Sequence, residues 1–343
     1  MNIETSVYAS SLTTIKLGGR IAYFVKAFSD SDIVEAINFA NKKDLPYKVI
    51  GGGSNIIFPD EGYKGVVIKN CISDFNINKN GDEVTITAGA GIELDKVVLW
   101  SIVNELSGME RLSWIPGTIG AAPVQNVSAY GQSISDVLLY LESIDIERNQ
   151  VVRLSQEDCE FGYRDSIFKS NKKGNFIITR VILSFKIGVK PELDNVQISE
   201  VIEERFKEQK NSLMAIRHAL FEIRASKGMV LDAVSNAFGT VGSFFINPEV
   251  DIEKINVLKE AYPDIVFFNT GEKYRIPAAW LIEKAGFERG LKFKNVGISP
   301  FHNLALITYS GSTTAQLLEF CKEIQLRVKE KFDIDLIPEP DIV

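Results

Sequence analysis

Two kinds of feature in this sequence are suited to chemistry: a glycine cluster, and single polar side chains flanked by glycine, proline or aromatic residues. The cluster is Gly51-Gly52-Gly53-Ser54-Asn55, between the apolar runs YKVI and IIF. Successive N–H groups in such a turn form a nest for an anion, and Ser54 and Asn55 add side-chain donors. The cluster lacks the Gly-Lys-Ser/Thr ending of a P-loop and the spacing of a Rossmann turn, so a plain tight turn is an equal alternative.

A second candidate is the stretch from Leu112 to Ser135, which carries no charged side chain. Its prolines, glycines and side-chain amides would break and hydrate a membrane-spanning helix, so it is predicted to be a system of loops. We call it the neutral loop. A neutral, glycine-rich segment suits close backbone contact with a large planar or phosphorylated ligand.

Three single residues are less telling on residue type alone. Arg164 stands beside Asp165, and a structural ion pair is the favoured interpretation. Ser243 follows Gly242 without a histidine neighbour, so a turn hydroxyl explains it as well as a nucleophile does. Glu339 lies between two prolines and would ordinarily be a solvated residue of a tail.

The rare residues exclude whole classes of site. The chain has 343 residues, two histidines (His218 and His302) and three widely spaced cysteines (Cys71, Cys159 and Cys321). No C-x-x-C or H-E-x-x-H motif exists, so no metal site is expected, and unpaired cysteines indicate a reducing compartment. Both histidines are interpreted as packing or surface residues.

The composition further limits which kinds of protein this chain could be. With 38 Lys+Arg against 45 Asp+Glu, the net charge of −7 argues against a nucleic-acid scaffold. The 45% hydrophobic share is that of a globular protein, and the length favours more than one lobe. No apolar run suggests a membrane span and the N-terminus lacks the pattern of a signal peptide, so a cytoplasmic location is predicted.

The elements that must position these residues mix helix and strand. Apolar spacing predicts a helix from Asp32 to Lys43, begun by Asp32 with Glu35 as a capping box, and a helix ending at Gly108. Strands are predicted over residues 47–50, 56–58, 84–88, 143–148 and 176–187.

The second half begins at a polar turn from Val189 to Asn195, which is predicted to be a domain boundary. One long charged helix is expected from Ile198 to Ser226. A smaller α+β lobe follows, with helices over residues 277–286 and about 313–331 and a strand over residues 303–309. The closing residues from Asp333 onwards are expected to form a strand that ends in an exposed tail.

Six segments occur in a characteristic order: GGGSNIIF, IPGTIGAAPVQNVSAYG, CEFGYRDSIFK, GSFFINP, AAWLIEKAGF and the final Pro338-Glu339. The same segments occur in the same order in the UDP-N-acetylenolpyruvoylglucosamine reductase family, which the chain resembles from about residue 14 to residue 339. The AAPVQN-x-x-AYG and YRDSIFK strings are specific to it, whereas GGGSN alone is not.

The resemblance implies an α+β fold with two parts. The first is a two-lobed FAD-binding domain of the p-cresol methylhydroxylase/vanillyl-alcohol oxidase type, and the second is a smaller α+β substrate-binding domain. The implied boundaries are residues 1–188, with lobes at about 1–70 and 71–188, then 196–335, then a C-terminal tail over 336–343 that carries Glu339.

The family also implies a cofactor and a reaction. FAD, held non-covalently, would be bound by Gly51, Gly52, Gly53, Ser54, Asn55, Pro116, Gly117, Thr118, Gly120, Ala121, Gln125 and Asn126. The enzyme implied is an oxidoreductase, a UDP-N-acetylmuramate dehydrogenase of peptidoglycan precursor synthesis. It would use NADPH to reduce UDP-N-acetylglucosamine enolpyruvate to UDP-N-acetylmuramate, with hydride added at the β-carbon of the enol ether.

The resemblance assigns roles to single residues as well. Arg164 would polarise the substrate carboxylate, Glu339 would assist it, and Ser243 would protonate the α-carbon. Substrate contacts are implied for Tyr163, Lys227 and Asn247. A monomer without nucleic-acid or membrane partners is expected.

Two other functions stay open on the sequence. One is a flavin oxidase or dehydrogenase of the same fold that acts on another substrate. Attachment of the flavin to a histidine of the FAD domain is excluded, because the first histidine is His218. The other is a nucleotide-binding sensor without turnover, which the presence of Arg164, Ser243 and Glu339 disfavours.

Overall fold

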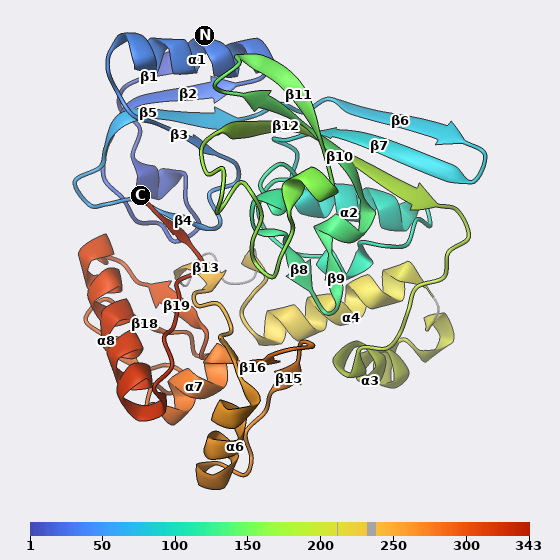
Figure 1. The fold of residues 1–343 in the computed structure, drawn as a ribbon, viewed down its shortest axis with the longest axis vertical. Coiled ribbons are helices and arrows are strands. Elements are labelled where there is room, and N and C mark those ends of the chain that lie inside the picture. The colour runs from blue at the N-terminus through green and yellow to red at the C-terminus, as the bar shows by residue number, and fades with distance from the viewer. Residues whose placement is uncertain (211, 232–237) are drawn as a thin grey trace. The chain divides into compact units, whose positions relative to one another are not determined.

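The computed structural model describes residues 1–210, 212–231 and 238–343, and the chain forms two compact units, each built from separate stretches. Unit 1 comprises Met1–Val7, Ile21–Gly53 and Tyr63–Ser226. Unit 2 comprises Tyr8–Arg20, Ser54–Gly62 and Lys227–Val343. Both units contain helices and strands, so the chain is of the expected α+β class (Figure 1).

Unit 1 contains a four-stranded sheet covered by helix α1 (Asp30–Lys42). Its order is β1 (Ile3–Glu4), β2 (Ile21–Ala27), β5 (Tyr63–Asn70) and β3 (Tyr47–Ile50). The prediction that Asp32 begins the helix is wrong. Ser29 is the N-cap and accepts the Asp32 N–H at 3.1 Å, whereas Asp32 accepts the Phe28 N–H, a bond that lowers the pKa of the Asp32 carboxyl.

A second sheet of unit 1 is antiparallel and carries helix α2 (Leu94–Val103). Its strand order is β11 (Gln150–Ser155), β10 (Leu138–Asp145), β12 (Phe176–Lys186), β7 (Glu83–Gly89) and β6 (Phe75–Asn80). Strands β7 and β12 confirm the strands predicted over residues 84–88 and 176–187, whereas β10 contains only the first three residues of the strand predicted over 143–148. No strand was predicted at β6 or β11, and β6 and β7 form the long hairpin of Figure 1. Helix α2 ends at Val103 with Asn104 as its C-cap, earlier than the predicted cap at Gly108.

The neutral loop folds as predicted, as loops with short elements. These are the 3-10 turns η3 (Ala122–Gln125) and η4 (Ile134–Val137) and a two-stranded ribbon of β8 (Ser128–Ala129) and β9 (Gln132–Ser133). Within the residues that the structure describes, no helix is long and apolar enough to cross a membrane.

The single helix expected from Ile198 to Ser226 is two helices, α3 (Val196–Arg205) and α4 (Leu213–Ser226). Their apolar faces pack together, and Ser212 begins the second helix by accepting the Ala215 N–H at 3.2 Å. Residue 211 lies outside the described residues. Both helices belong to unit 1, whereas the sequence placed them in the substrate domain.

Unit 2 contains a four-stranded sheet and a three-stranded sheet. The larger has the order β13 (Gly239–Ser243), β19 (Ala305–Thr308), β18 (Val296–Ile298) and β17 (Lys292–Phe293), and α7 (Ala278–Lys284) and α8 (Thr314–Phe332) share its hydrophobic core. The smaller joins β14 (Glu249–Val250), β16 (Tyr274–Arg275) and β15 (Phe268–Asn269), and helix α6 (Ile252–Ala261) follows β14.

The closing residues are held in place, contrary to the expected exposed tail. Strand β20 (Asp341–Ile342) pairs in parallel with β4 (Ile56–Ile57), and the Val343 N–H donates to the Ile57 carbonyl at 3.0 Å. The stretch that carries β4 is anchored further on, where Asp60 accepts the first N–H groups of α8.

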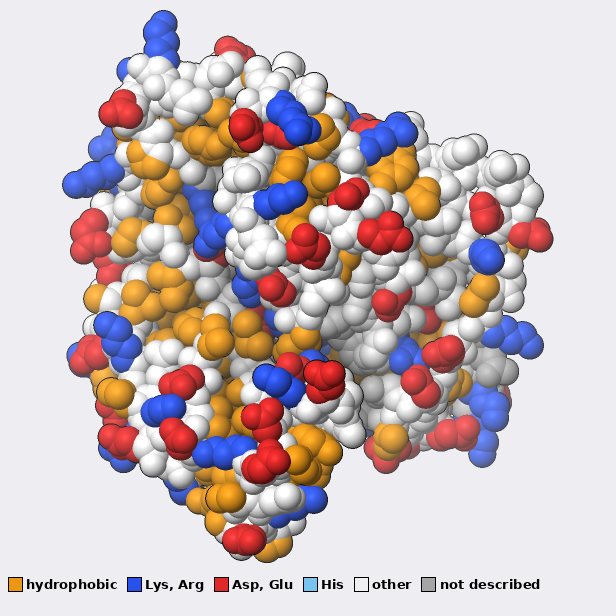
Figure 2. All heavy atoms as spheres, in the orientation of Figure 1, with side chains coloured by type: hydrophobic (Ala, Val, Ile, Leu, Met, Phe, Trp, Pro, Cys, Tyr) orange, Lys and Arg blue, Asp and Glu red, His pale blue; other side chains and the backbone are white. Residues whose placement is uncertain are grey.

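Charged side chains of both signs are mixed over the face shown in Figure 2. On that face, the described residues form no single acidic patch.

Candidate active site

The glycine cluster lies directly against the neutral loop in unit 1. A Cβ on Gly51 would stand 2.3 Å from Thr118 Oγ1, and a Cβ on Gly52 would stand 2.9 Å from Gly117 Cα. No side chain fits at either glycine without moving a neighbour. The structure thus brings together the two segments predicted to hold the cofactor, although Ser54 and Asn55 belong to unit 2.

The neutral loop is fixed by backbone hydrogen bonds to the segment that leads into α2. The Leu94 N–H donates to Gly117 O at 3.0 Å, and the Gly120 N–H donates to Ala90 O at 3.0 Å. A Cβ on Gly120 would stand 2.3 Å from that of Ala90, so packing alone explains this glycine.

Thr118 provides the test of whether a cofactor fits here. Thr118 is 7% exposed, and its Oγ1 is buried without a hydrogen-bond partner among the described residues. A buried hydroxyl left unbonded is costly, and this one lies beside a turn whose N–H groups suit a diphosphate. The donor set and the absence of charge fit the FAD implied by the resemblance.

Gly52→Ala is expected to weaken FAD binding about tenfold. The added methyl group would press against the backbone of Gly117, and such overpacking costs about 1–3 kcal/mol that no change of rotamer can relieve. Titration of the apoprotein with FAD, followed by quenching of flavin fluorescence, measures the change. Gly81→Ala is the matched control, since Gly81 has a positive φ of 61° but open space around its Cβ position. Equal affinities for the two variants would contradict the close contact.

Asn126 connects the neutral loop to the loop that carries Arg164. Its backbone is left-handed, with φ of 45°, its Nδ2 donates to Gly162 O at 3.3 Å and its Oδ1 accepts the Ser135 N–H at 3.3 Å. Ser166 adds a second link by donating to Val124 O at 2.6 Å. Pro116, Ala121 and Gln125 lie in the same loop, and Ala121 is in contact range of Gly51.

Arg164 occupies the third position of a tight turn that is closed by the Gly162 N–H bonding Asp165 O at 3.1 Å. Its φ is +56°, which costs an arginine about 1 kcal/mol and is usually left to glycine or asparagine. Its Nη1 donates to Ser128 Oγ at 2.7 Å and Ser128 O at 3.1 Å, and its guanidinium lies 5.5 Å from the Tyr163 ring centroid. These contacts hold the guanidinium beside the neutral loop.

Ser243 and Glu339 lie on neighbouring segments of unit 2. Ser243 ends β13 after an irregularity in the β13–β19 register, where Gly242 has φ of 77° and donates to Thr240 Oγ1. The Glu339 N–H donates to the carbonyl of Phe244 at 2.9 Å. Two residues far apart in sequence are thereby brought together, and both side chains are half-buried.

The remaining predicted substrate residues have structural partners in unit 2. Asn247 Oδ1 accepts the Ala278 N–H at 2.8 Å, at the start of α7. Lys227 is half-buried, and its charge lies near enough to His302 to lower the pKa of the His302 imidazole.

Burial lowers the pKa of His302 to about 4, from about 6.5, and the charges of Lys227 and Arg289 act in the same direction. The unfolded chain therefore binds more protons than the folded one between these pH values. The contribution of neutral His302 to the unfolding free energy is complete above pH 6.5 and is lost as the pH drops towards 4.

We expect the wild-type protein to lose about 3 kcal/mol more unfolding free energy than His302→Gln on going from neutral pH to pH about 4. Denaturant titrations at several pH values measure this loss. His218→Gln is the control, because His218 is exposed on α4. A wild-type profile that matches that of His302→Gln would show that His302 does not titrate in this way.

Sequence reasoning missed two supporting residues. Ser128 holds Arg164, and Asn55, which was predicted only for the cofactor, donates from Nδ2 to Glu339 O at 3.4 Å. The sequence carries no signal for the Ser128 contact. Asn55 and Glu339 are 284 residues apart, and only the pairing of β4 with β20 makes their contact predictable.

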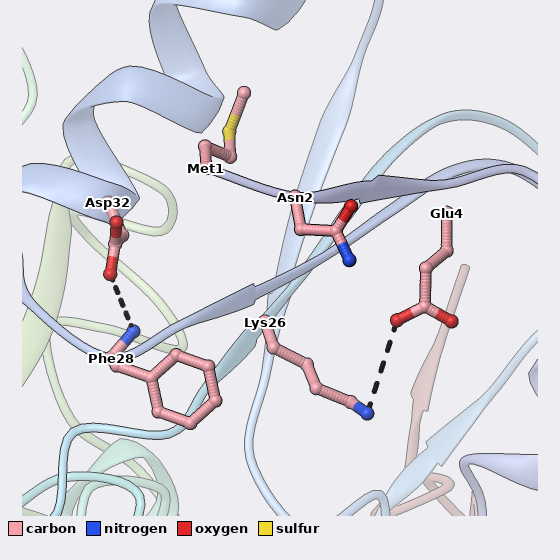
Figure 3. Close-up of a pocket in the computed structure, with 6 residues that line it drawn as sticks. All are labelled: Met1, Asn2, Glu4, Lys26, Phe28 and Asp32. Atoms are coloured by element: carbon pink, nitrogen blue, oxygen red, sulfur yellow. Dashed lines mark hydrogen bonds and ion pairs between the residues drawn. The ribbon is translucent and has the colours of Figure 1, made fainter.

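A pocket of about 350 Å³ lies elsewhere in unit 1, beside β2, and is lined by Met1, Asn2, Glu4, Lys26, Phe28 and Asp32 (Figure 3). Lys26 and Glu4 face one another across it at 4.0 Å. It contains none of the predicted site residues. No group of three or more His, Cys, Asp or Glu in the described part of the chain is placed to hold a metal.

Comparison with known proteins identifies two matching families. Residues 21–155 match the FAD binding domain family, and residues 233–343 match the UDP-N-acetylenolpyruvoylglucosamine reductase C-terminal domain. The reductase of Thermobifida fusca is 34% identical, with 98% of this chain and 97% of that protein covered, and that of Amoebophilus asiaticus is 33% identical over 100% of both.

The same fold occurs in a solved structure. The crystal structure of the UDP-N-acetylenolpyruvylglucosamine reductase of Thermus caldophilus matches 100% of this chain and 99% of that one, with a TM-score of 0.67 and 22% identity. This likeness confirms the fold class expected from the sequence. The two curated reductases are 34% and 33% identical to this chain over 97% and 100% of their own length. The chain therefore belongs to the UDP-N-acetylenolpyruvoylglucosamine reductase family.

Proposed function

We propose that the protein is an FAD-dependent oxidoreductase that uses NADPH to reduce UDP-N-acetylglucosamine enolpyruvate to UDP-N-acetylmuramate. The observation that carries this proposal is the match to curated reductases over the whole chain. The peptidoglycan precursor pathway is then its setting. Binding of anionic nucleotides by an acidic chain depends on local cations such as Arg164 and Lys227 rather than on net charge.

Among the residues of unit 1 that would hold FAD are Gly51–Gly53, Pro116, Gly117 and Thr118. The glycine N–H groups would neutralise the diphosphate, and the hydroxyl of Thr118 would gain the partner it lacks among the described residues. When bound, FAD would supply the hydride chemistry that links NADPH to the β-carbon of the enol ether. The remaining FAD contacts proposed are those of Ser54, Asn55, Gly120, Ala121, Gln125 and Asn126.

Three side chains are proposed to carry the other catalytic tasks. Hydride addition at the β-carbon moves the alkene electron pair to the α-carbon and its carboxylate. The Arg164 guanidinium stabilises this charge, and Glu339 assists. The Ser243 hydroxyl gives its proton to the α-carbon to complete the lactyl ether, and solvent then restores the proton on Ser243. Tyr163, Lys227 and Asn247 are proposed to bind the substrate.

One experiment tests the function. The purified protein is mixed anaerobically with NADPH and then with UDP-N-acetylglucosamine enolpyruvate, while its visible absorbance is followed. Bleaching by NADPH and recovery with the enol ether are expected, together with UDP-N-acetylmuramate as product. Colourless protein that takes up no FAD, or bleached protein that the enol ether does not reoxidise, would overturn the proposal.

A further inference from the structure

We propose that Asp95, Trp114 and Arg217 form a clamp, called here the Asp95 clamp, that positions the neutral loop for FAD. The helix pair α3–α4 would then be a positioning element of the flavin site rather than packing alone. This proposal rests on the proposed function only in that the neutral loop contacts FAD. Both helices lie between the two family matches, and no role in the proposed reaction falls to them.

The centre of the clamp is the Asp95 carboxylate in the first turn of α2. Its Oδ1 accepts the Trp114 N–H at 2.6 Å and Arg217 Nη1 at 2.7 Å, while its Oδ2 accepts Arg217 Nη2 at 2.6 Å. Arg217 comes from α4 and is 4% exposed. A two-point contact between a planar guanidinium and a carboxylate fixes direction as well as distance.

The same arginine residue holds the Trp114 side chain. The guanidinium carbon lies 4.0 Å from the indole ring centroid, and the indole Nε1 donates to the Arg217 carbonyl at 3.1 Å. Phe221, one turn further along α4, packs edge-on at 5.0 Å from the same ring. Backbone and side chain of Trp114 are therefore both set by the Asp95–Arg217 pair.

The Asp95–Arg217 pair matters for the flavin site because the Trp114 backbone is strained and precedes the predicted FAD contacts. Its φ of +66° is rare for a bulky residue and persists only when its surroundings impose it. Three residues later, Gly117 O accepts the Leu94 N–H, next to Asp95. Release of Trp114 would let its backbone return to negative φ and rotate the peptide groups that lead to Pro116, Gly117 and Thr118.

The test compares Arg217→Lys and Arg217→Met with Arg180→Lys. Arg180 is a matched control, since it lies in the same unit and bonds two carboxylates, those of Asp30 and Asp74, outside the neutral loop. FAD affinity of each apoprotein is measured by fluorescence quenching, the environment of bound FAD by visible circular dichroism, and stability by thermal unfolding.

Arg217→Lys, which keeps the charge but not the fork, is expected to raise the Kd for FAD about tenfold, and Arg217→Met to raise it further. Both should alter the circular dichroism of bound FAD. Arg180→Lys should lower the melting temperature yet leave the Kd within about twofold of wild type. Trp114→Phe, which keeps the ring but loses the Nε1 donor, should raise the Kd less than Arg217→Lys.

Wild-type Kd and circular dichroism in Arg217→Lys and Trp114→Phe would overturn the clamp, whatever happens to stability. Those two conservative variants decide the matter if Arg217→Met fails to fold. A wild-type protein that binds no FAD would instead overturn the proposed function, so the two failures are distinguishable.

Discussion

The Ser243→Ala protein is expected to be reduced by NADPH at nearly the wild-type rate and to reduce the enol ether about 10³-fold more slowly. Reduction by NADPH requires no proton from Ser243, whereas the α-carbon of the substrate cannot be completed without one. The backbone around Ser243 is set by Gly242 and by the pairing with Ala305, so loss of the hydroxyl should leave the strand in place.

Anaerobic stopped-flow absorbance separates the two half-reactions. Ser312→Ala is the control, because Ser312 is a hydroxyl of the same unit whose bonds are to Asn295 O and Tyr309 O. It should leave both rates unchanged. Equal slowing of both half-reactions in Ser243→Ala would mean that Ser243 supports folding or shared binding instead.

Arg164→Lys is expected to slow reduction of the enol ether about 10²-fold. The positive charge remains, but lysine cannot present the planar fork that binds a carboxylate at two points. Because lysine keeps the same β-carbon at the same positive φ, the backbone strain at position 164 is common to both proteins. The difference between them reports on the head group.

The rate of reoxidation by the enol ether, measured over a range of substrate concentrations, separates weaker binding from slower chemistry. Arg153→Lys is a matched control in the same unit. Arg153 also lies over a tyrosine ring, at 4.8 Å from the centroid of Tyr140, but on the exposed strand β11. Wild-type reoxidation by Arg164→Lys would remove Arg164 from the proposed role.

Local pattern predicted several elements of the fold, but not the strands β2 and β5 or the helix α6. The strand, glycine turn and strand around Gly51 and the helix α8 with its Thr313 cap agree with the sequence, because caps and apolar spacing are local signals. The long helix expected up to Ser226 fails for a local reason as well. Ser212 offers a second N-cap within a charged stretch that hydrophobic spacing alone reads as continuous.

The sequence names candidate site residues but not their arrangement. The motifs identify Arg164, Ser243 and Glu339 through family resemblance, whereas nothing in residue type alone raises Glu339 above a tail residue. Its placement comes from the bond to Phe244 O and from β20, which are pairings between distant segments. The Asp95 clamp was equally invisible, since its members come from α2, the neutral loop and α4.

The parallel pairing of β4 with β20 also sets an order of events during synthesis on the ribosome. All stretches of unit 1 have been made once Ser226 has emerged, but Ile56 and Ile57, which are buried in unit 2, have no strand partner until Asp341 and Ile342 have been made. Until then these apolar side chains lack that pairing and are open to wrong contacts or to chaperones. Because Asn55 and Glu339 are 284 residues apart, their contact is expected to form late in the folding of unit 2.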